Sequence, residues 1–365
     1  MSDDLARYHR QMLLPGFGPA GQARLRGSTV LVLGCGALGC LVADLLARAG
    51  VGHLVIVDRD VVELTNLQRQ LLFDEQDAAE GLPKAVAAER RLAKVNSAVR
   101  VTPVVDDLDR GNIERYATGV DVLVDGLDNF ETRYLANDFA VKRGIPFIYG
   151  GAVGSTGAAF TILPHTANGA AAWETQDGID RATPCLRCLF EEPPPAGSTP
   201  TCDTIGVLAS AVTTIASFEA AETLKVLTGS FDRVATTLLN VDLWHNTVAQ
   251  LKVADACARG DCPCCRQRRF EFLEGARGSG AITLCGRDAV QIKPREDTVR
   301  LDLDAVALRL GDRGTLRRSE FMLRATIMDG GRQYSLSLFP DGRAIVHGTG
   351  DTAVARSLYA KYVGA

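Results

Sequence analysis

The chain has 365 residues, of which 46% are hydrophobic, and a formal net charge of −4 at pH 7. This length predicts one large domain plus a smaller one, and the composition supplies enough apolar side chains for a packed core. The negative charge argues against a dominant nucleic-acid surface, so no direct nucleic-acid partner is expected. The polar start MSDDLARYHR, with no long apolar run after it, predicts neither a signal peptide nor a membrane-spanning helix and indicates a cytoplasmic protein.

Strands and helices alternate through the first half of the chain. Residues 1–26 predict a short helical lead-in, which is followed by a buried strand over 28–33, a glycine turn and an apolar helix over 37–49. The pattern then predicts, in order, strand 53–58, helix 84–95, strand 100–105, a helix near Ile113, strand 121–129, helix 131–143 and strand 146–151. Strands separated by helices of this length make a parallel, doubly wound, Rossmann-like sheet, which is an α/β fold.

The second half of the chain predicts a change of architecture. Residues 191–201, EEPPPAGSTPT, predict a mobile surface loop, and a long apolar helix follows over about 205–228. Beyond residue 266 the pattern predicts, in order, a strand, a helix over 303–310, two strands joined at 329–331, a strand over 343–348 and a last helix over 353–363. We therefore expect two domains, residues 1–266 and a small α+β domain over 267–365.

A glycine-rich turn joins the first strand to the first long helix. Gly34, Gly36 and Gly39 form G-x-G-x-x-G, and Ala37 begins the helix. Such glycines let the backbone approach a phosphate, and the helix start offers N–H groups to bind it. Asp58 ends the next strand, where a carboxylate would bind ribose hydroxyls. These features indicate a nucleotide, and they fit an NAD-dependent oxidoreductase as well as an ATP enzyme.

The stretch LTNLQRQLLF, residues 64–73, favours ATP over a dinucleotide. A nucleoside triphosphate carries two further phosphates, which need guanidinium and amide donors plus a metal. Asp128 follows a strand, where its carboxylate would hold Mg²⁺. Arg69 or Lys84 alone would be interpreted as a solvated surface charge, but the whole set at one ligand edge favours a site. The candidate ATP residues beyond the glycine turn and Asp58 are Asn66, Leu67, Arg69, Gln70, Lys84, Leu127, Asp128 and Asn129.

Two pairs of cysteines have the spacing of zinc knuckles. In a reducing compartment, ten cysteines indicate metal binding or catalysis more than disulfides. Cys185 and Cys188 form one C-x-x-C pair, and Cys262 and Cys265 form the other. A closed four-cysteine Zn²⁺ site of this kind is structural. Cys264 offers an alternative ligand, although the C-x-x-C spacing favours Cys265, and reduced thiols without metal remain the other alternative.

The sequence resembles the MoeB/ThiF family over about residues 5–266, through these motifs in order: RYHRQMLLPGFG, GCGALGC, DRDVVELTNLQRQ, GLPKA, DGLDN, PCLRC and CPCC. These proteins are bacterial relatives of ubiquitin-activating enzymes. The resemblance implies an enzyme that uses ATP and Mg²⁺ to adenylate the C-terminal glycine of a ubiquitin-like sulfur carrier of the MoaD/ThiS kind, releasing pyrophosphate. It also implies the same ATP site and the same zinc site. Many relatives have glycine at the position of Ala37, where a methyl group is a small departure.

The resemblance gives two further residues a role. Arg10 matches an arginine that reaches the ATP of the neighbouring subunit, which implies a homodimer. Cys202 matches a cysteine that some relatives use for thioester, persulfide or acyl-disulfide chemistry. A helix start beside Cys202 would favour the thiolate, whereas the simpler alternative is a small residue that begins a helix. A sulfur donor, either a cysteine desulfurase or a rhodanese, would be a further partner, although nothing around Cys285 resembles a rhodanese loop.

Three other functions stay open at this point: a tRNA-modifying dehydratase that also adenylates, a degenerate partner subunit, and an NAD-dependent oxidoreductase. The presence of Arg69, Lys84 and Asp128 disfavours the degenerate subunit, and the NLQRQ cluster with the zinc knuckles disfavours the oxidoreductase. The sequence does not identify the pathway that the carrier feeds. For the C-terminal domain, docking of the carrier or a sulfur donor and a packing role are equally open.

Overall fold

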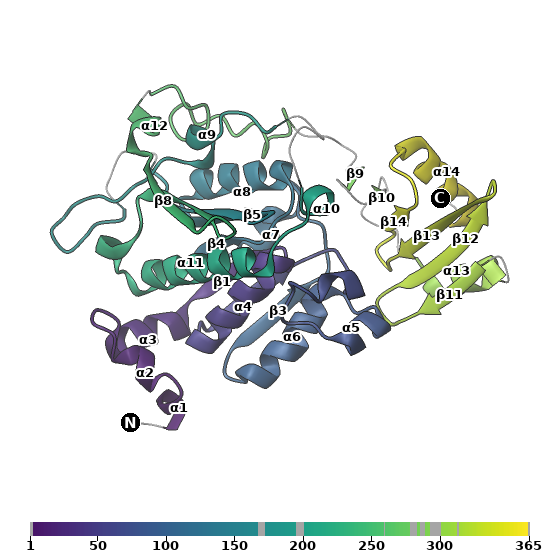
Figure 1. The fold of residues 1–365 in the computed structure, drawn as a ribbon, viewed down its shortest axis with the longest axis horizontal. Helices are drawn as coiled ribbons and strands as arrows, with labels where there is room; N and C mark the ends of the chain where they lie inside the picture. Colours follow the sequence, from purple (N-terminus) through teal and green to yellow (C-terminus); the bar gives the residue numbers. More distant parts are fainter. Residues whose placement is uncertain are drawn as a thin grey trace. The chain divides into compact units, whose positions relative to one another are not determined.

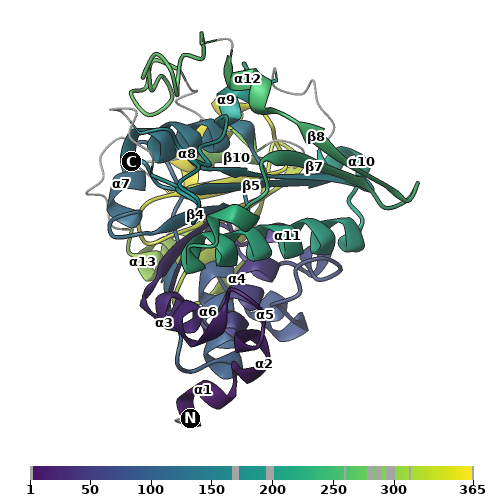
Figure 2. The same cartoon turned by 90° about the vertical axis from the view of Figure 1, so that its left-hand side faces the viewer.

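The computed structural model describes residues 3–166, 172–194, 201–258, 260–277, 283–284, 289–292, 301–311 and 314–363. The chain divides into two compact units, which are Met1–Pro194 with Val207–Gly278, and Pro195–Gly206 with Ser279–Ala365. Both units appear in Figure 1 and, turned by 90°, in Figure 2. Residues 195–200 of the predicted proline-rich loop and Cys285 lie outside the described residues.

An eight-stranded sheet forms the centre of the first unit. In spatial order its strands are β3 (Arg100–Val104), β2 (His53–Val57), β1 (Thr29–Leu33), β4 (Val122–Asp125), β5 (Phe147–Val153), β6 (Thr156–Ile162), β7 (Thr237–Asp242) and β8 (Thr247–Lys252). The strands from β3 to β5 are parallel, and they coincide with the five predicted strands. The strand order reverses between β1 and β4, and such a switch point is where open α/β sheets bind ligands.

The sheet is mixed, because three antiparallel strands that were not predicted extend the five parallel ones. Only Gly154 and Ser155 separate β5 from β6, and a two-residue connection can join only antiparallel neighbours. Gly154 has a φ of +60°, which glycine adopts without strain. Strands β7 and β8 continue the antiparallel part of the sheet.

Helices cover both faces of this sheet. The helices and 3-10 turns of the first unit are α1 (Asp3–Ala6), α2 (His9–Met12), α3 (Gly18–Gly27), α4 (Ala37–Ala49), η1 (Leu64–Asn66), α5 (Glu75–Glu80), α6 (Lys84–Val95), α7 (Ile113–Tyr116), α8 (Phe130–Arg143), α9 (Leu186–Leu189), α11 (Ala209–Thr228), η2 (Phe231–Arg233) and α12 (Ala254–Ala258). Figure 1 shows α4 and α11 on one face and α8 on the other. Among the described residues, no helix is long and apolar enough to span a membrane.

Two boundaries differ from the sequence-based expectation. The long helix begins at Ala209, and the separate four-residue helix α10 (Cys202–Ile205) precedes it. Gly206, with a φ of +79°, separates the two helices. Residues 267–277, which we expected in the second domain, pack in the first unit, where Phe270 and Phe272 are buried in the core beside α8.

The second unit contains a six-stranded antiparallel sheet of order β11-β12-β13-β14-β10-β9. Its elements besides α10 are β9 (Thr283–Leu284), β10 (Ala289–Ile292), α13 (Leu303–Leu310), β11 (Gly314–Arg318), β12 (Leu323–Asp329), β13 (Arg332–Leu338), β14 (Ala344–His347) and α14 (Thr352–Tyr362). Leu303 and Val306 of α13 and Leu358 of α14 pack with Leu336 of the sheet in a separate core. This is the predicted α+β arrangement, and Gly330 and Gly331 form the expected turn between β12 and β13.

Candidate active site

A glycine turn joins β1 to α4 at the carboxyl edge of the sheet. Gly34 has a φ of +87°, and a Cβ there would lie 2.6 Å from the carbonyl oxygen of Gly126, while a Cβ on Gly39 would lie 1.9 Å from Gly34 O. A Cβ on Gly36 would lie 3.7 Å from the carbonyl oxygen of Gly126, which is an ordinary van der Waals contact. No described side chain caps the start of α4 at Ala37. Gly34 and Gly39 therefore let the turn pack, while Gly36 and the first N–H groups of α4 offer space and donors to a phosphate.

Asp58 follows β2 with a buried carboxylate. Its Oδ2 accepts the Cys35 N–H at 2.6 Å, and its Oδ1 accepts the Asp60 N–H at 2.7 Å. Burial raises the pKa of Asp58 above its ordinary value, and the nearby Lys84 ammonium partly offsets this effect. Asp58 therefore ties the glycine turn to the end of β2, where the predicted ribose hydroxyls would meet its oxygens.

Four side chains form a line of alternating charges beside Asp58. Lys84 Nζ lies 3.0 Å from Asp60 Oδ2, and only 2% of Lys84 is exposed. Arg59 lies 3.0 Å from Asp107 Oδ1 through Nη1 and 3.8 Å from Asp60 Oδ1 through Nε. The buried Lys84 ammonium is thus paired with Asp60, and ATP phosphates would offer it a further anion. Of these four residues only Lys84 is predicted from the sequence, and the DRD run at the end of β2 is the signal for Arg59 and Asp60.

One residue of the LTNLQRQLLF segment, Gln70, has a buried polar side chain that fits a bound ligand. Asn66 is buried, but its side-chain oxygen accepts the Glu63 N–H at 3.0 Å and so caps η1. Arg69 is half-buried and donates to a backbone carbonyl of the same turn at 2.9 Å. Gln70 is 3% exposed, and no described group hydrogen-bonds to its side-chain oxygen. Because a buried amide oxygen without a donor is costly, Gln70 fits an interaction with a ligand.

The loop after β4 carries Asp128 to the same edge. Gly126 of this loop packs against Gly34, since β1 and β4 are neighbours. Asp128 is exposed, whereas Asn129 caps α8 by accepting the Thr132 N–H at 2.8 Å. The predicted apolar contacts Leu67 and Leu127 are both partly exposed. The loop therefore carries Asp128 to the edge of the sheet where the glycine turn lies, and the side-chain oxygen of Asn129 caps the helix.

The two predicted cysteine pairs meet in the first unit. The Sγ atoms of Cys185, Cys188, Cys262 and Cys265 all lie within 4.8 Å of one another, and the four residues are buried. Neighbouring sulfurs are 3.9, 3.7 and 3.4 Å apart for the pairs 185–188, 185–262 and 188–265. Four thiolates at about 2.3 Å from a tetrahedral Zn²⁺ would stand about 3.8 Å from one another. The donor set and its spacing therefore fit zinc, and this ion would supply structural cross-linking.

Cys264 is fully buried next to the cluster but stands outside the four-sulfur set. The Asn137 side-chain N–H of α8 donates to its sulfur at 3.3 Å. The side-chain oxygen of Asn137 accepts the Leu186 N–H at 2.8 Å. Asn137 therefore fastens both knuckles to α8, and Cys264 has a packing role that explains why CPCC contains a third cysteine.

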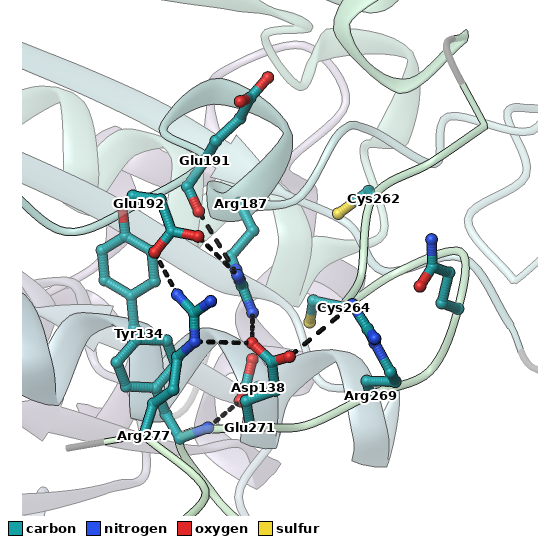
Figure 3. Close-up of polar contacts among 12 residues, drawn as sticks. Tyr134, Asp138, Arg187, Glu191, Glu192, Cys262, Cys264, Arg269, Glu271 and Arg277 are labelled. Carbon is teal, nitrogen blue, oxygen red and sulfur yellow. Dashed lines mark hydrogen bonds and ion pairs between the residues drawn. The ribbon is translucent and has the colours of Figure 1, made fainter.

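Ion pairs add a second link between the two knuckle segments. Figure 3 shows Arg187 and Arg277 pointing toward the carboxylates of Glu192 and Glu271. Arg187 lies between Cys185 and Cys188 in sequence and is 2% exposed, and its Nη1 is 2.8 Å from Glu271. Arg277 is 3.2 Å from Glu271 and also contacts Glu192, which lies 3.7 Å from Arg187. Positive and negative charges alternate around this ring of four residues. The ion pairs therefore link the segment at and just after the first cysteine pair to the segment after the second pair.

We expect Cys188→Ser to lose zinc and to lower stability by several kcal/mol, because the metal joins segments far apart in the chain. Zinc content per chain and denaturant unfolding would measure both effects. Cys264→Ser is the matched control, since it changes a buried neighbouring thiol outside the four-sulfur set. The control should keep about one zinc per chain. Full zinc occupancy in Cys188→Ser would show that the ligands are wrongly assigned.

Comparison with known proteins agrees with this geometry. The ThiF family matches residues 8–264. The chain is 41% identical over 359 residues to the sulfur carrier protein ThiS adenylyltransferase of Bacillus subtilis, covering 98% of this chain and 99% of that protein. The chain belongs to the ThiF family. The resemblance predicted from the motifs is thereby confirmed.

Two further comparisons bear on this ThiF-family chain. It is 39% identical over 263 residues to a sulfur carrier protein adenylyltransferase of Thermus thermophilus, covering 72% of this chain and 91% of that protein. Among solved structures, Escherichia coli MccB with ATP aligns with a TM-score of 0.54 and 23% identity over 68% of this chain and 72% of that chain, a likeness that shows the fold alone. The Bacillus match extends over the second unit, whereas the Thermus match spans a shorter part of the chain.

The amino-terminal motif of the ThiF-family chain is anchored by the residues around Arg10. Tyr8 is 4% exposed, and its hydroxyl accepts the side-chain N–H of Asn96 at 2.8 Å. Gln11 donates through Nε2 to the carbonyl oxygen of Ala49 at 2.7 Å. Arg10 is exposed and pairs with no acid among the described residues. The motif therefore uses Tyr8 and Gln11 to hold α2 in place, and it presents Arg10 outward.

Cys202 lies in the second unit and is exposed at the start of α10, which Thr201 caps. This helix has only four residues, and the long helix α11 begins at Ala209. The expectation that a long helix start would favour the Cys202 thiolate therefore loses its basis, because a single turn has little macrodipole. The exposure of the Cys202 thiol is the remaining feature that fits a role in sulfur or acyl transfer.

Glu219 of α11 is a buried carboxyl beneath β5. It is 0% exposed, and neither side-chain oxygen has a hydrogen-bond partner among the described residues. A Cβ on Gly150 would lie 2.3 Å from its carboxyl carbon, so glycine at that position makes room for this acid. Burial raises the pKa of Glu219 well above its ordinary value, and the Asp125 carboxylate adds to this effect.

We expect Glu219→Gln to stabilise the protein increasingly as pH rises. Above the pKa of the unfolded state, the unfolded chain releases this proton while the folded protein keeps it, so wild-type stability falls with rising pH. The slope is at most about 1.4 kcal/mol per pH unit for one proton. Denaturant unfolding at pH 5 and pH 8 measures the difference. Glu222→Gln, which disturbs a carboxylate hydrogen-bonded to Thr161, should destabilise at both pH values. An equal effect of Glu219→Gln at both pH values would contradict a neutral Glu219.

Proposed function

We propose that this ThiF-family protein is an ATP-dependent adenylyltransferase that activates the C-terminal glycine of a ubiquitin-like sulfur carrier ending in Gly-Gly. The observation that carries the proposal is the meeting of the glycine turn, Lys84 and the Asp128 loop at one switch point of the sheet. The Bacillus and Thermus relatives, which are named sulfur carrier protein adenylyltransferases, support the same substrate class.

The reaction requires positioning and charge neutralisation more than proton transfer. The carrier carboxylate is ionised at neutral pH and attacks the α-phosphate in line, while pyrophosphate leaves. The N–H groups at the start of α4, Arg69, Lys84 and the Gln70 amide would hold the phosphates. Asp128 would hold Mg²⁺, which neutralises phosphate charge when bound. No general base is needed, so the absence of histidine from the predicted ATP site is consistent with this chemistry.

The proposal extends to the protein's partners and location. It includes a homodimer, in which Arg10 completes the neighbouring site, and a sulfur donor of the cysteine desulfurase or rhodanese class that acts after adenylation. It also includes a cytoplasmic location, where ATP is abundant and the cysteines stay reduced. The second unit would dock the carrier or the sulfur donor, and the alternative is that it packs without contacting either partner.

The test is carrier-dependent exchange of labelled pyrophosphate into ATP. A purified ubiquitin-like carrier ending in Gly-Gly should start the exchange, and the same carrier without its last glycine should not. A binding module or an oxidoreductase would give no exchange with either carrier. An enzyme that adenylates tRNA would respond to tRNA and ignore the carrier, which would overturn the proposal.

We expect Cys202→Ala to retain pyrophosphate exchange within about twofold of wild type. Formation of an acyl-adenylate requires no thiol, so only a later transfer to sulfur would suffer. Exchange measures the first step, and capture of a carrier thioester or persulfide measures the later one. Cys202→Ser keeps the size and polarity of the side chain and serves as the control for packing. Loss of exchange in a folded Cys202→Ala protein would show that the two steps are not separable at this residue.

A further inference from the structure

Arg133 lies buried in the first turn of α8, beneath the loop that carries Asp128. Its side chain is 9% exposed. The guanidinium donates to groups on the neighbouring strands β4 and β5 and on the loop that joins β4 to α8. Nε donates to Asp125 Oδ2 at 2.8 Å, and Nη2 donates to the carbonyl oxygens of Leu127 at 2.6 Å and Gly150 at 3.2 Å. One side chain therefore ties the end of β4, the Asp128 loop and β5 together.

Asp125 completes the hold on the loop from the other side. This carboxylate is fully buried, and its Oδ1 accepts the Leu127 N–H at 2.9 Å. The ion pair of Asp125 with Arg133 therefore holds both the N–H and the carbonyl of Leu127. Asp128 is the next residue and is exposed. The backbone just before Asp128 is therefore held in place, although the Asp128 carboxylate is exposed to solvent.

Packing prevents Arg133 from leaving this position. The guanidinium carbon lies 5.6 Å from the ring centroids of both Phe130 and Tyr149, a separation within the range of cation–π contacts. Arg133 also falls four residues after Asn129, so the residue that caps α8 and the residue that holds Leu127 occupy one face of the helix. The hydrogen-bond acceptors of the guanidinium are all protein groups: the Asp125 carboxylate and the backbone carbonyls of Leu127 and Gly150.

We propose that Arg133 is a positioning residue for adenylation, holding Leu127 so that the Asp128 carboxylate meets the Mg²⁺ of the nucleotide. This inference rests on the proposed role of Asp128 as the magnesium ligand. Lysine cannot replace this arginine, because a single ammonium on a flexible stem does not reproduce a planar fork that donates in three directions. A loop displaced by about 1 Å from a productive geometry can cost on the order of 100-fold in rate.

The test is the magnesium dependence of carrier-dependent pyrophosphate exchange in Arg133→Lys. We expect the Mg²⁺ concentration for half-maximal exchange to rise about tenfold and the maximal rate to fall by about 10- to 100-fold. Arg268→Lys is the matched control. Its arginine donates to the carbonyl oxygens of Val141 at 3.0 Å and Lys142 at 3.3 Å, at the far end of the same helix. This control should keep the wild-type magnesium dependence.

A folded Arg133→Lys protein with wild-type magnesium dependence would overturn the inference. A magnesium shift of the same size in Arg268→Lys would overturn it too, because the effect would then be general weakening of α8. If Arg133→Lys does not fold, Arg133→Gln keeps one donor for a carbonyl, and the same magnesium titration decides. Asp128→Ala separates the two proposals: retained exchange in that variant would show that the magnesium role of Asp128 is wrong, whatever Arg133 does.

Discussion

Asp128→Ala should reduce carrier-dependent pyrophosphate exchange to background, a loss of at least about 10²- to 10³-fold, which is the cost of removing one electrostatic group from a preorganised site. The fold should stay intact. Asp128 is exposed on a loop, and its carboxylate accepts a long hydrogen bond from Asn129 Nδ2 at 3.5 Å. Exchange assays and thermal unfolding would measure the two properties on the same preparation, and the melting temperature should match that of wild type within a few degrees.

Asp121→Ala is the matched control for this prediction. Asp121 lies just before β4, at the opposite end of the strand from the Asp128 loop; it is exposed and accepts the Thr29 N–H at 2.8 Å. Its loss removes an aspartate and a hydrogen bond without touching the carboxyl edge of the sheet, so exchange should continue at a rate near that of wild type. If Asp128→Ala retained most of its exchange, another residue would have to hold the magnesium ion.

Most of the parallel half of the sheet could be predicted because β1, β2 and β4 are buried along nearly their whole length. Runs such as Thr29–Leu33 are continuous stretches of β-branched and aliphatic residues between turn and helix signals. The antiparallel half lacks this signal. Strand β6 begins Thr-Gly-Ala-Ala, and β8 is exposed along its whole length, so neither shows a continuous apolar run or a clear alternation. The hairpin at Gly154 makes β6 antiparallel to β5, and a hairpin turn of this kind is easily missed beside a glycine-rich strand.

Some residues of the candidate site could be predicted from short sequence motifs, whereas others could be recognised only in the folded structure. Gly34, Lys84 and Asp128 stand in short motifs whose spacing already implies phosphate or metal chemistry, so the sequence could name them. Arg133 and Asp125 could not be named, because their importance lies in hydrogen bonds to the backbones of Leu127 and Gly150, which only the packed structure brings within reach. The cysteine pairs lie between these cases: each pair was evident from its spacing, but their meeting depended on the fold.

Arg10→Ala is expected to cause a second large loss of pyrophosphate exchange, and the placement of Arg10 in the structure adds to the reason for this expectation. Tyr8 and Gln11 fix α2 through buried hydrogen bonds, while Arg10 is exposed and has no acidic partner among the described residues. The alternative that Arg10 forms an ion pair within its own chain finds no support there. A guanidinium delivered to the neighbouring subunit would neutralise the β- and γ-phosphates as pyrophosphate departs. Arg10→Ala homodimers should therefore lose about 10³-fold or more of their exchange activity, as arginine fingers do in other phosphoryl-transfer enzymes.

A mixed dimer distinguishes action on the neighbouring subunit from action within one chain. Arg10→Ala and Asp128→Ala chains, each inactive as a homodimer, are co-expressed with different tags, and the heterodimer is isolated. If Arg10 acts across an isologous interface, the Arg10→Ala chain keeps an intact Asp128 and receives its arginine from the Asp128→Ala chain. One working site per dimer should then restore about half of the wild-type exchange. If Arg10 acts within its own chain, each site lacks one essential group and the heterodimer stays inactive. The control is a dimer of two differently tagged Arg10→Ala chains, which lacks the arginine on both sides and should stay inactive whether Arg10 acts across the interface or within its own chain.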